Sequence, residues 1–97
     1  MTRSEHLLVC LAEESSEVAK SVTKVLRFGL LGSHPEYYGG MTNIEMVRRE
    51  LHDLIAVMEM VNDDVWDILP IDRALVEEKK SKVLKFIEYA KSNGDIE

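Results

Sequence analysis

The sequence predicts an all-α protein, a helical bundle of three main helices. Apolar residues recur at the three- and four-residue spacing of a helix in three long segments. Glycine and proline lie between these segments, and no segment reads as a β-strand. The 97 residues fit one domain spanning 1–97. Because so short a chain buries a modest core, we expect homo-oligomerisation to complete it.

The first helix is expected from about Ser4 to Phe28, with Ser4 as its N-cap and Gly29 and Gly32 ending it. Its apolar stripe consists of Leu7, Leu11, Val18, Val22 and Val25. A glycine-rich loop, GLLGSHPEYYGGMTN, then covers residues 29–43 and contains four glycines and one proline. Connections this long are often functional.

The second helix is expected from about Asn43 to Val61 or slightly beyond, capped by Thr42 or Asn43. Its stripe consists of Val47, Leu51, Leu54, Met58 and Val65. Pro70 breaks the chain, and Asp72 would cap a third helix reaching about Lys91. The residues expected to face inward on it are Leu75, Val76, Val83, Phe86 and Ala90. The polar tail, residues 92–97, is expected to fray.

Composition excludes several classes of protein. The formal net charge of −6 argues against nucleic-acid binding, which relies on a basic surface. The only cysteine, Cys10, permits no internal disulfide, which favours the cytoplasm. No signal peptide or apolar run of membrane-spanning length is visible, so we expect no membrane partner.

Four carboxylates intrude on the faces that should pack. Glu14 lies within the stripe of the first helix and Glu17 at its edge, while Glu50 lies within the stripe of the second helix and Asp53 at its edge. A buried carboxylate is costly without a partner. Glutamates in helices are usually solvated, and one such pair would be ordinary. Two pairs on facing stripes favour a hard divalent cation, Mg²⁺ or Mn²⁺, as their shared partner.

The order of the motifs resembles a known family. EESSE (13–17) followed by ELHD (50–53) resembles the EExxE…ExxD signature of the MazG-like, all-α nucleoside triphosphate pyrophosphohydrolases. The resemblance implies helical bundles assembled as dimers or tetramers, which use Mg²⁺ to hydrolyse a (deoxy)nucleoside triphosphate to the monophosphate and pyrophosphate. The implied metal ligands are Glu14, Glu17, Glu50 and Asp53. Residues 18–49 separate the motifs by more than is usual in the family, which leaves the substrate's base and sugar open.

Other residues are candidates for substrate binding. Lys79 and Lys82 on the third helix would hold phosphate oxygens, and Asn62 a phosphate or sugar hydroxyl. Tyr37 and Tyr38 in the loop would contact a base. Each has an ordinary alternative: solvated lysines, a helix-end asparagine, and tyrosines that anchor the loop or an interface. Trp66, just past the second helix, is expected to pack rather than bind ligand.

The implied chemistry is metal-assisted hydrolysis. A water activated by Mg²⁺ attacks the α-phosphorus, and Glu17 or Glu50 takes the proton. A GxxxxGK phosphate loop is absent, which excludes ordinary P-loop chemistry. A di-iron bundle would need Glu-x-x-His pairs, which these motifs lack. Two alternatives stay open: a non-catalytic nucleotide- or metal-binding regulatory module, and a helical interaction protein whose acids are exposed.

Overall fold

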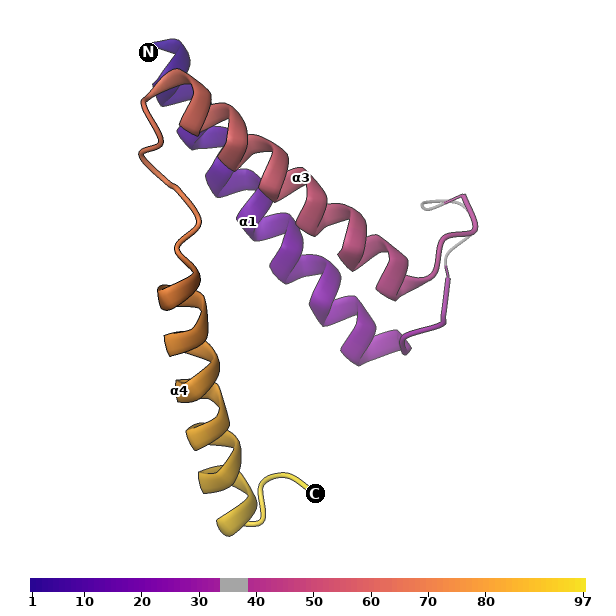
Figure 1. Ribbon diagram of the computed structural model, residues 1–97. Helices are drawn as coiled ribbons and strands as arrows, with labels where there is room; N and C mark the ends of the chain where they lie inside the picture. The colour runs from indigo at the N-terminus through magenta and orange to yellow at the C-terminus, as the bar shows by residue number, and fades with distance from the viewer. Residues whose placement is uncertain (34–38) are drawn as a thin grey trace.

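The computed structural model describes residues 1–33 and 39–97. These ranges contain three α-helices: α1 (Arg3–Phe28), α3 (Asn43–Asp64) and α4 (Arg73–Ser92) (Figure 1). Within the same ranges the β structure is a single isolated bridge between Ser33 and Thr42. The all-α prediction is therefore confirmed, with helix bounds within a few residues of those expected. None of the helices in these ranges has the length and apolar character needed to cross a membrane.

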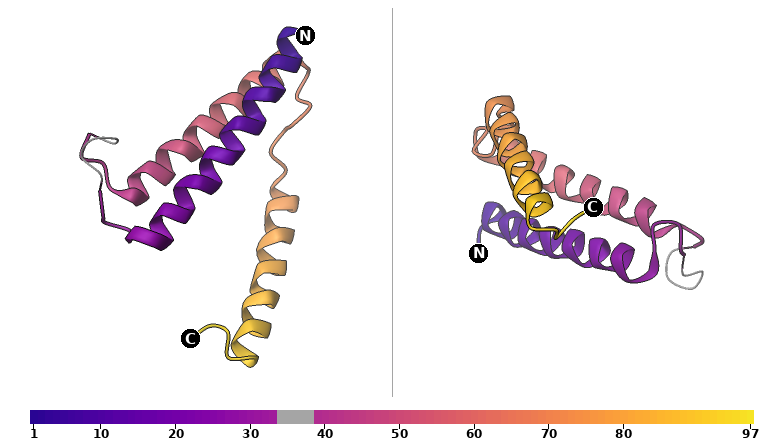
Figure 2. Two further views of the ribbon diagram at one scale, coloured as in Figure 1. Left: turned by 180° about the vertical axis from the view of Figure 1, so that it is seen from behind. Right: turned by 90° about the horizontal axis from the view of Figure 1, so that it is seen from below.

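Helices α1 and α3 form an antiparallel hairpin and lie side by side along their length (Figures 1 and 2). The side chains of Leu7, Val47 and Val61 are buried at this interface. Farther round each stripe the packing is incomplete, since Val22 and Leu51 keep about two-fifths of their surface (41% and 42%) exposed. The hairpin therefore positions the acidic residues of both stripes, but it leaves apolar surface uncovered.

The N-terminus of α1 is capped by Thr2 rather than by Ser4, so the predicted cap was wrong. The Thr2 hydroxyl accepts a hydrogen bond from the Glu5 N–H (3.1 Å), and the Glu5 carboxylate accepts one from the Thr2 N–H (2.8 Å). This reciprocal capping box satisfies two backbone donors at once, which a cap at Ser4 would not do with the residues that follow it.

Asn43 ties the start of α3 to the end of α1. Its buried side chain donates from Nδ2 to the Gly29 carbonyl (2.9 Å), and its backbone N–H donates to the Gly32 carbonyl (2.8 Å). A Cβ at Gly32 would lie 2.7 Å from the Phe28 carbonyl oxygen, so the close approach requires glycine there. Thr42 caps α3 by accepting the Glu45 N–H (3.2 Å). The ends of the long connection are thus fixed by specific bonds.

The opposite end of the hairpin is held by an ion pair. The Arg3 guanidinium pairs with Asp64 at 2.7 Å and joins the start of α1 to the end of α3.

Beyond α3, Trp66 and Asp67 adopt positive φ angles of 28° and 48°. Trp66 is 97% exposed. The expectation that Trp66 packs is wrong within this chain, because the turn directs its ring into solvent.

Helix α4 begins after the predicted cap, Asp72, whose side chain accepts the Ala74 N–H at 2.9 Å. The helix then diverges from the hairpin (Figures 1 and 2) and contains no buried residue. The expected inward packing of Leu75, Val83 and Phe86 is therefore absent; their exposed fractions are 63%, 41% and 67%. The other two residues expected to face inward, Val76 and Ala90, are half-buried. The periodicity of the sequence therefore identified an apolar face, but the described chain leaves most of that face exposed.

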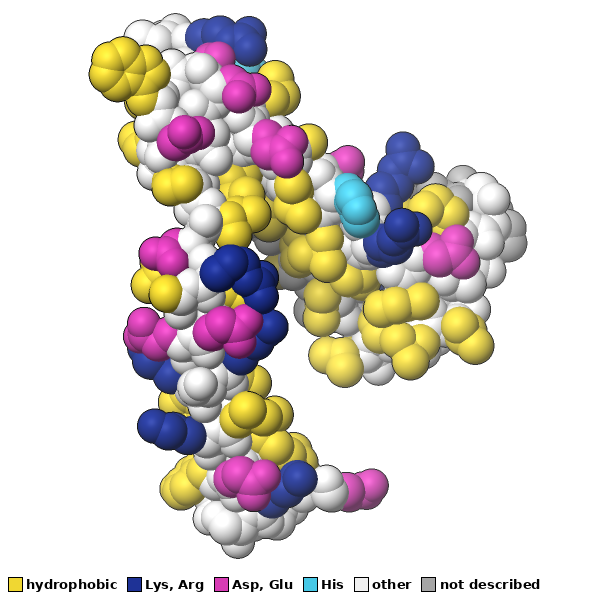
Figure 3. Space-filling model, viewed as in Figure 1, with side chains coloured by type: hydrophobic (Ala, Val, Ile, Leu, Met, Phe, Trp, Pro, Cys, Tyr) yellow, Lys and Arg dark blue, Asp and Glu magenta, His cyan; other side chains and the backbone are white. Residues whose placement is uncertain are grey.

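The overall dimensions reflect this divergence. The accessible surface is 7690 Å², whereas a folded monomer of 11.1 kDa has roughly 5,700 Å². The radius of gyration is 16.9 Å, against about 12.5 Å for a compact domain of this length. Hydrophobic side chains gather along α4 and on the hairpin surface beside it (Figure 3).

Candidate metal and nucleotide site

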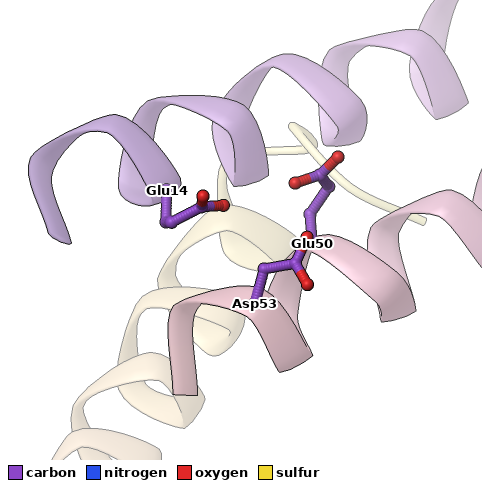
Figure 4. A group of neighbouring side chains, drawn as sticks. All are labelled: Glu14, Glu50 and Asp53. Carbon is purple, nitrogen blue, oxygen red and sulfur yellow. The ribbon is translucent and has the colours of Figure 1, made fainter. Parts of the chain in front are cut away.

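Three carboxylates from the two hairpin helices converge. Glu14 on α1 points toward α3, Glu50 on α3 points back toward α1, and Asp53 lies beside Glu50 (Figure 4). One oxygen from each lies within 4.8 Å of the others. These three residues are called the acidic cluster below. Their spacing permits a single cation to contact all three, and oxygen ligands of this kind suit Mg²⁺ or Mn²⁺.

The burial of the acids follows the order expected from their positions on the stripes. Glu14 and Glu50 are half-buried, while Glu17 and Asp53 are exposed. Glu13, the first residue of the EESSE motif, is also exposed. Glu17 is the one predicted ligand that falls outside the acidic cluster.

Glu50 is the electrostatic centre of this region. Burial raises the pKa of its carboxyl group, and the negative charges of Asp53, Glu14 and Glu17 raise it further. Arg49 acts in the opposite direction. The other three predicted metal ligands, Glu17 included, therefore each act on Glu50. A divalent cation would remove the repulsion that these charges impose on one another.

A small hollow of about 100 Å³ adjoins the acidic cluster. Glu17 and Glu50 form its wall on the side of the cluster, and Lys20 and Lys24 project from the next turns of α1. The residues that line it are Glu17, Lys20, Ser21, Lys24, Met46 and Glu50, and it is called the lysine hollow below. The two lysines were not candidates from the sequence. The signal that could have found them is their spacing from Glu17, three and seven residues on, which keeps them on its face of α1.

The lysines that were predicted lie elsewhere in the fold. Lys79 and Lys82 are exposed on α4, which does not pack extensively on either hairpin helix. Lys82 forms an ion pair with Glu78 at 3.2 Å. Within one chain these lysines do not line the lysine hollow, and their substrate role stays a prediction.

Asn62 has a structural function in the turn after α3. Its amide donates from Nδ2 to the Leu69 carbonyl (2.9 Å) and accepts the Leu69 N–H on Oδ1 (2.7 Å). These two bonds hold residues 62–69 in a closed turn, and a role in substrate binding stays a prediction. Tyr37 and Tyr38 lie outside the described residues.

Comparison of the chain with protein-family models, curated proteins and solved structures gives no match. What the site can do is therefore argued from its own residues. It combines convergent carboxylates, suited to a hard cation, with lysines, suited to an anion, along one interhelical surface.

Proposed function

We propose that the protein hydrolyses (deoxy)nucleoside triphosphates to the monophosphate and pyrophosphate with Mg²⁺, or alternatively Mn²⁺. The observation that carries this proposal is the acidic cluster, in which Glu14, Glu50 and Asp53 from two helices bring oxygens within 4.8 Å of one another. The order of the EESSE and ELHD motifs, which resembles that of the MazG-like pyrophosphohydrolases, supports the same activity.

The cation would be held by Glu14, Glu50 and Asp53, with Glu17 beside them. When bound, Mg²⁺ supplies neutralisation of the triphosphate charge and a lowered pKa for a water molecule. Glu17 is suited to accept the proton of the attacking water, because it lies outside the cluster yet interacts with Glu50. The oxygen of the water forms a new bond to the α-phosphorus. The bond between the α-phosphorus and the oxygen that bridges to the β-phosphate breaks, and pyrophosphate leaves.

We further propose that a second copy of the chain covers the exposed apolar surfaces, in a homodimer or homotetramer. The accessible surface of 7690 Å² exceeds the monomer expectation by roughly 2,000 Å². Two copies that each bury this excess would form an interface in the range of obligate dimers, about 2,000–5,000 Å² in total. In such an assembly α4 of the partner subunit would be the element able to bring Lys79 and Lys82 to the site. The single cysteine, Cys10, permits no disulfide within the chain, which supports a cytoplasmic location.

A panel of ribo- and deoxyribonucleoside triphosphates with Mg²⁺, scored for pyrophosphate and monophosphate, tests the activity. We expect release of pyrophosphate by the wild type and a loss of a hundredfold or more in Glu50→Gln. Glu59→Gln, which changes an exposed glutamate on the same helix, is the matched control and should retain activity. Undiminished pyrophosphate release in Glu50→Gln would remove the cluster from catalysis. Cation binding without any pyrophosphate release would favour the non-catalytic regulatory module instead.

A further inference from the structure

We propose that Lys20 and Lys24 on α1 bind the phosphate groups of the nucleotide. The phosphates would then lie in the lysine hollow and run from the acidic cluster toward the junction of α1 with α3. This inference rests on the proposed function, because it assigns the phosphate-binding groups of that same site. It gives this task to lysines of the hairpin itself, which need no second copy of the chain.

The first argument is position. The lysine hollow shares Glu50 with the acidic cluster, and Glu17 also lines the hollow. Along α1, Lys20 follows Glu17 by about 4.5 Å and Lys24 by about 10.5 Å, at the helical rise of roughly 1.5 Å per residue. A ligand that reaches the cation at one end therefore has ammonium groups within reach along the next two turns.

The second argument is charge. Three lysines on α4 form ion pairs with glutamates of the same helix: Lys80 with Glu77 and Lys82 with Glu78, both at 3.2 Å, and Lys91 with Glu88 at 3.9 Å. Lys20 forms no ion pair among the described residues, although Glu17 lies only three positions before it. Lys24 is half-buried. Cationic groups gathered in an interhelical hollow of a chain with net charge −6 favour an anionic ligand.

The third argument is the chemistry of the remaining lining. The Ser21 hydroxyl donates its proton to the Val18 carbonyl (2.9 Å), and Met46 offers only a thioether. The lysines are therefore the groups in the hollow that can donate to an anion. A lysine ammonium binds phosphate oxygens as a compact charge with three donors. Glu17 and Glu50, which line the hollow on the side of the acidic cluster, repel phosphate unless a cation lies between. The interhelical surface is thus suited to a cation at the acidic cluster and to phosphate at Lys20 and Lys24.

The test measures binding of a triphosphate analogue with a non-hydrolysable α,β-imido bridge, by calorimetry with Mg²⁺ at fixed ionic strength. Lys20→Met and Lys24→Met keep the aliphatic stem and remove the charge. We expect each to weaken analogue binding tenfold or more and to raise KM, while affinity for Mn²⁺ alone changes less than twofold. Lys20→Arg and Lys24→Arg should recover most of the affinity. Lys85→Met, an exposed lysine of α4, is the matched control and should bind as the wild type does.

The outcomes separate this inference from the function on which it rests. Wild-type hydrolysis with unchanged KM and analogue affinity in both methionine variants would overturn the lysine assignment alone. An equal loss in Lys85→Met would also overturn it, because the effect would then reflect net charge. If the wild type binds no analogue and releases no pyrophosphate, both proposals fall. Circular dichroism identifies any variant that fails to fold, and the arginine variant at that position then decides the outcome, since retained charge predicts retained binding.

Discussion

Glu14 on α1 and Glu50 on α3 lie half-buried on facing helices, with a carboxylate oxygen of each within 4.8 Å of the other. Asp53 joins them at the same spacing. Apolar residues at these two positions would strengthen the hairpin, so the carboxylates lower the stability of the metal-free chain. This loss of stability, and its relief by a bound cation, determine how we expect stability to respond to mutation, pH and metal.

Glu50→Gln should stabilise the metal-free protein. The substitution keeps the shape of the side chain and removes a charge that burial, Asp53, Glu14 and Glu17 all oppose. We expect the midpoint of thermal unfolding in chelator-containing buffer to rise by roughly 2–5 °C. Glu59→Gln should leave it within about 1 °C. A lower midpoint for Glu50→Gln would contradict the electrostatic account.

The raised pKa of the Glu50 carboxyl group predicts that the stability of the protein depends on pH. The pKa of Glu50 in the folded protein is raised above 4.5. Between 4.5 and the raised value, the folded state holds a proton that the unfolded state has lost, so stability falls as pH rises through this window. Urea unfolding of the wild type and Glu50→Gln from pH 4 to 7 should show the variant's advantage growing above about pH 4.5 and then levelling. An advantage that shrinks with rising pH would show the opposite shift.

Asn43 should contribute strongly to the stability of the hairpin. Asn43→Ala removes the buried donor to the Gly29 carbonyl and leaves that acceptor with one fewer partner. We expect a loss of about 1–3 kcal/mol in the free energy of unfolding by urea. Asn43→Asp, which keeps the shape but not the donor, should lose a similar amount. Ser15→Ala is the control, because its hydroxyl bond to the Leu11 carbonyl is exposed. A loss below about 0.5 kcal/mol at Asn43 would contradict this role.

The exposed apolar face of α4 predicts self-association. Light scattering coupled to gel filtration should give a mass at least twice 11.1 kDa. Phe86→Glu changes a side chain that is 67% exposed in one chain and should weaken the assembly tenfold or more. Lys85→Ala, its neighbour in sequence, should leave the mass unchanged. A monomeric wild type at micromolar concentration would exclude a second copy as the cover for α4.

The sequence supported the helices and the facing of the acids because both depend on periodicity. Glu14 and Glu50 lie on the apolar stripes of their helices regardless of how the helices pack. Periodicity does not say what covers a stripe, and for this reason the packing of Phe86 was predicted wrongly. Spacing places Lys20 on the same face of α1 as Glu17, but it does not show that a hollow lies between the helices there, so the sequence predicted no role for Lys20. The bonds of Asn62 to Leu69 depend on a turn that local sequence does not specify.

The central claim is that the facing carboxylates share one divalent cation. Electron paramagnetic resonance of Mn²⁺, titrated with protein in the absence of nucleotide, measures this directly through the loss of the free-ion signal. We expect saturable binding of Mn²⁺ by the wild type and by Glu59→Gln, displaced by excess Mg²⁺, and a loss of tenfold or more in affinity for Glu14→Gln and Glu50→Gln. Equal affinity in all four proteins, or no binding by the wild type, would contradict the account.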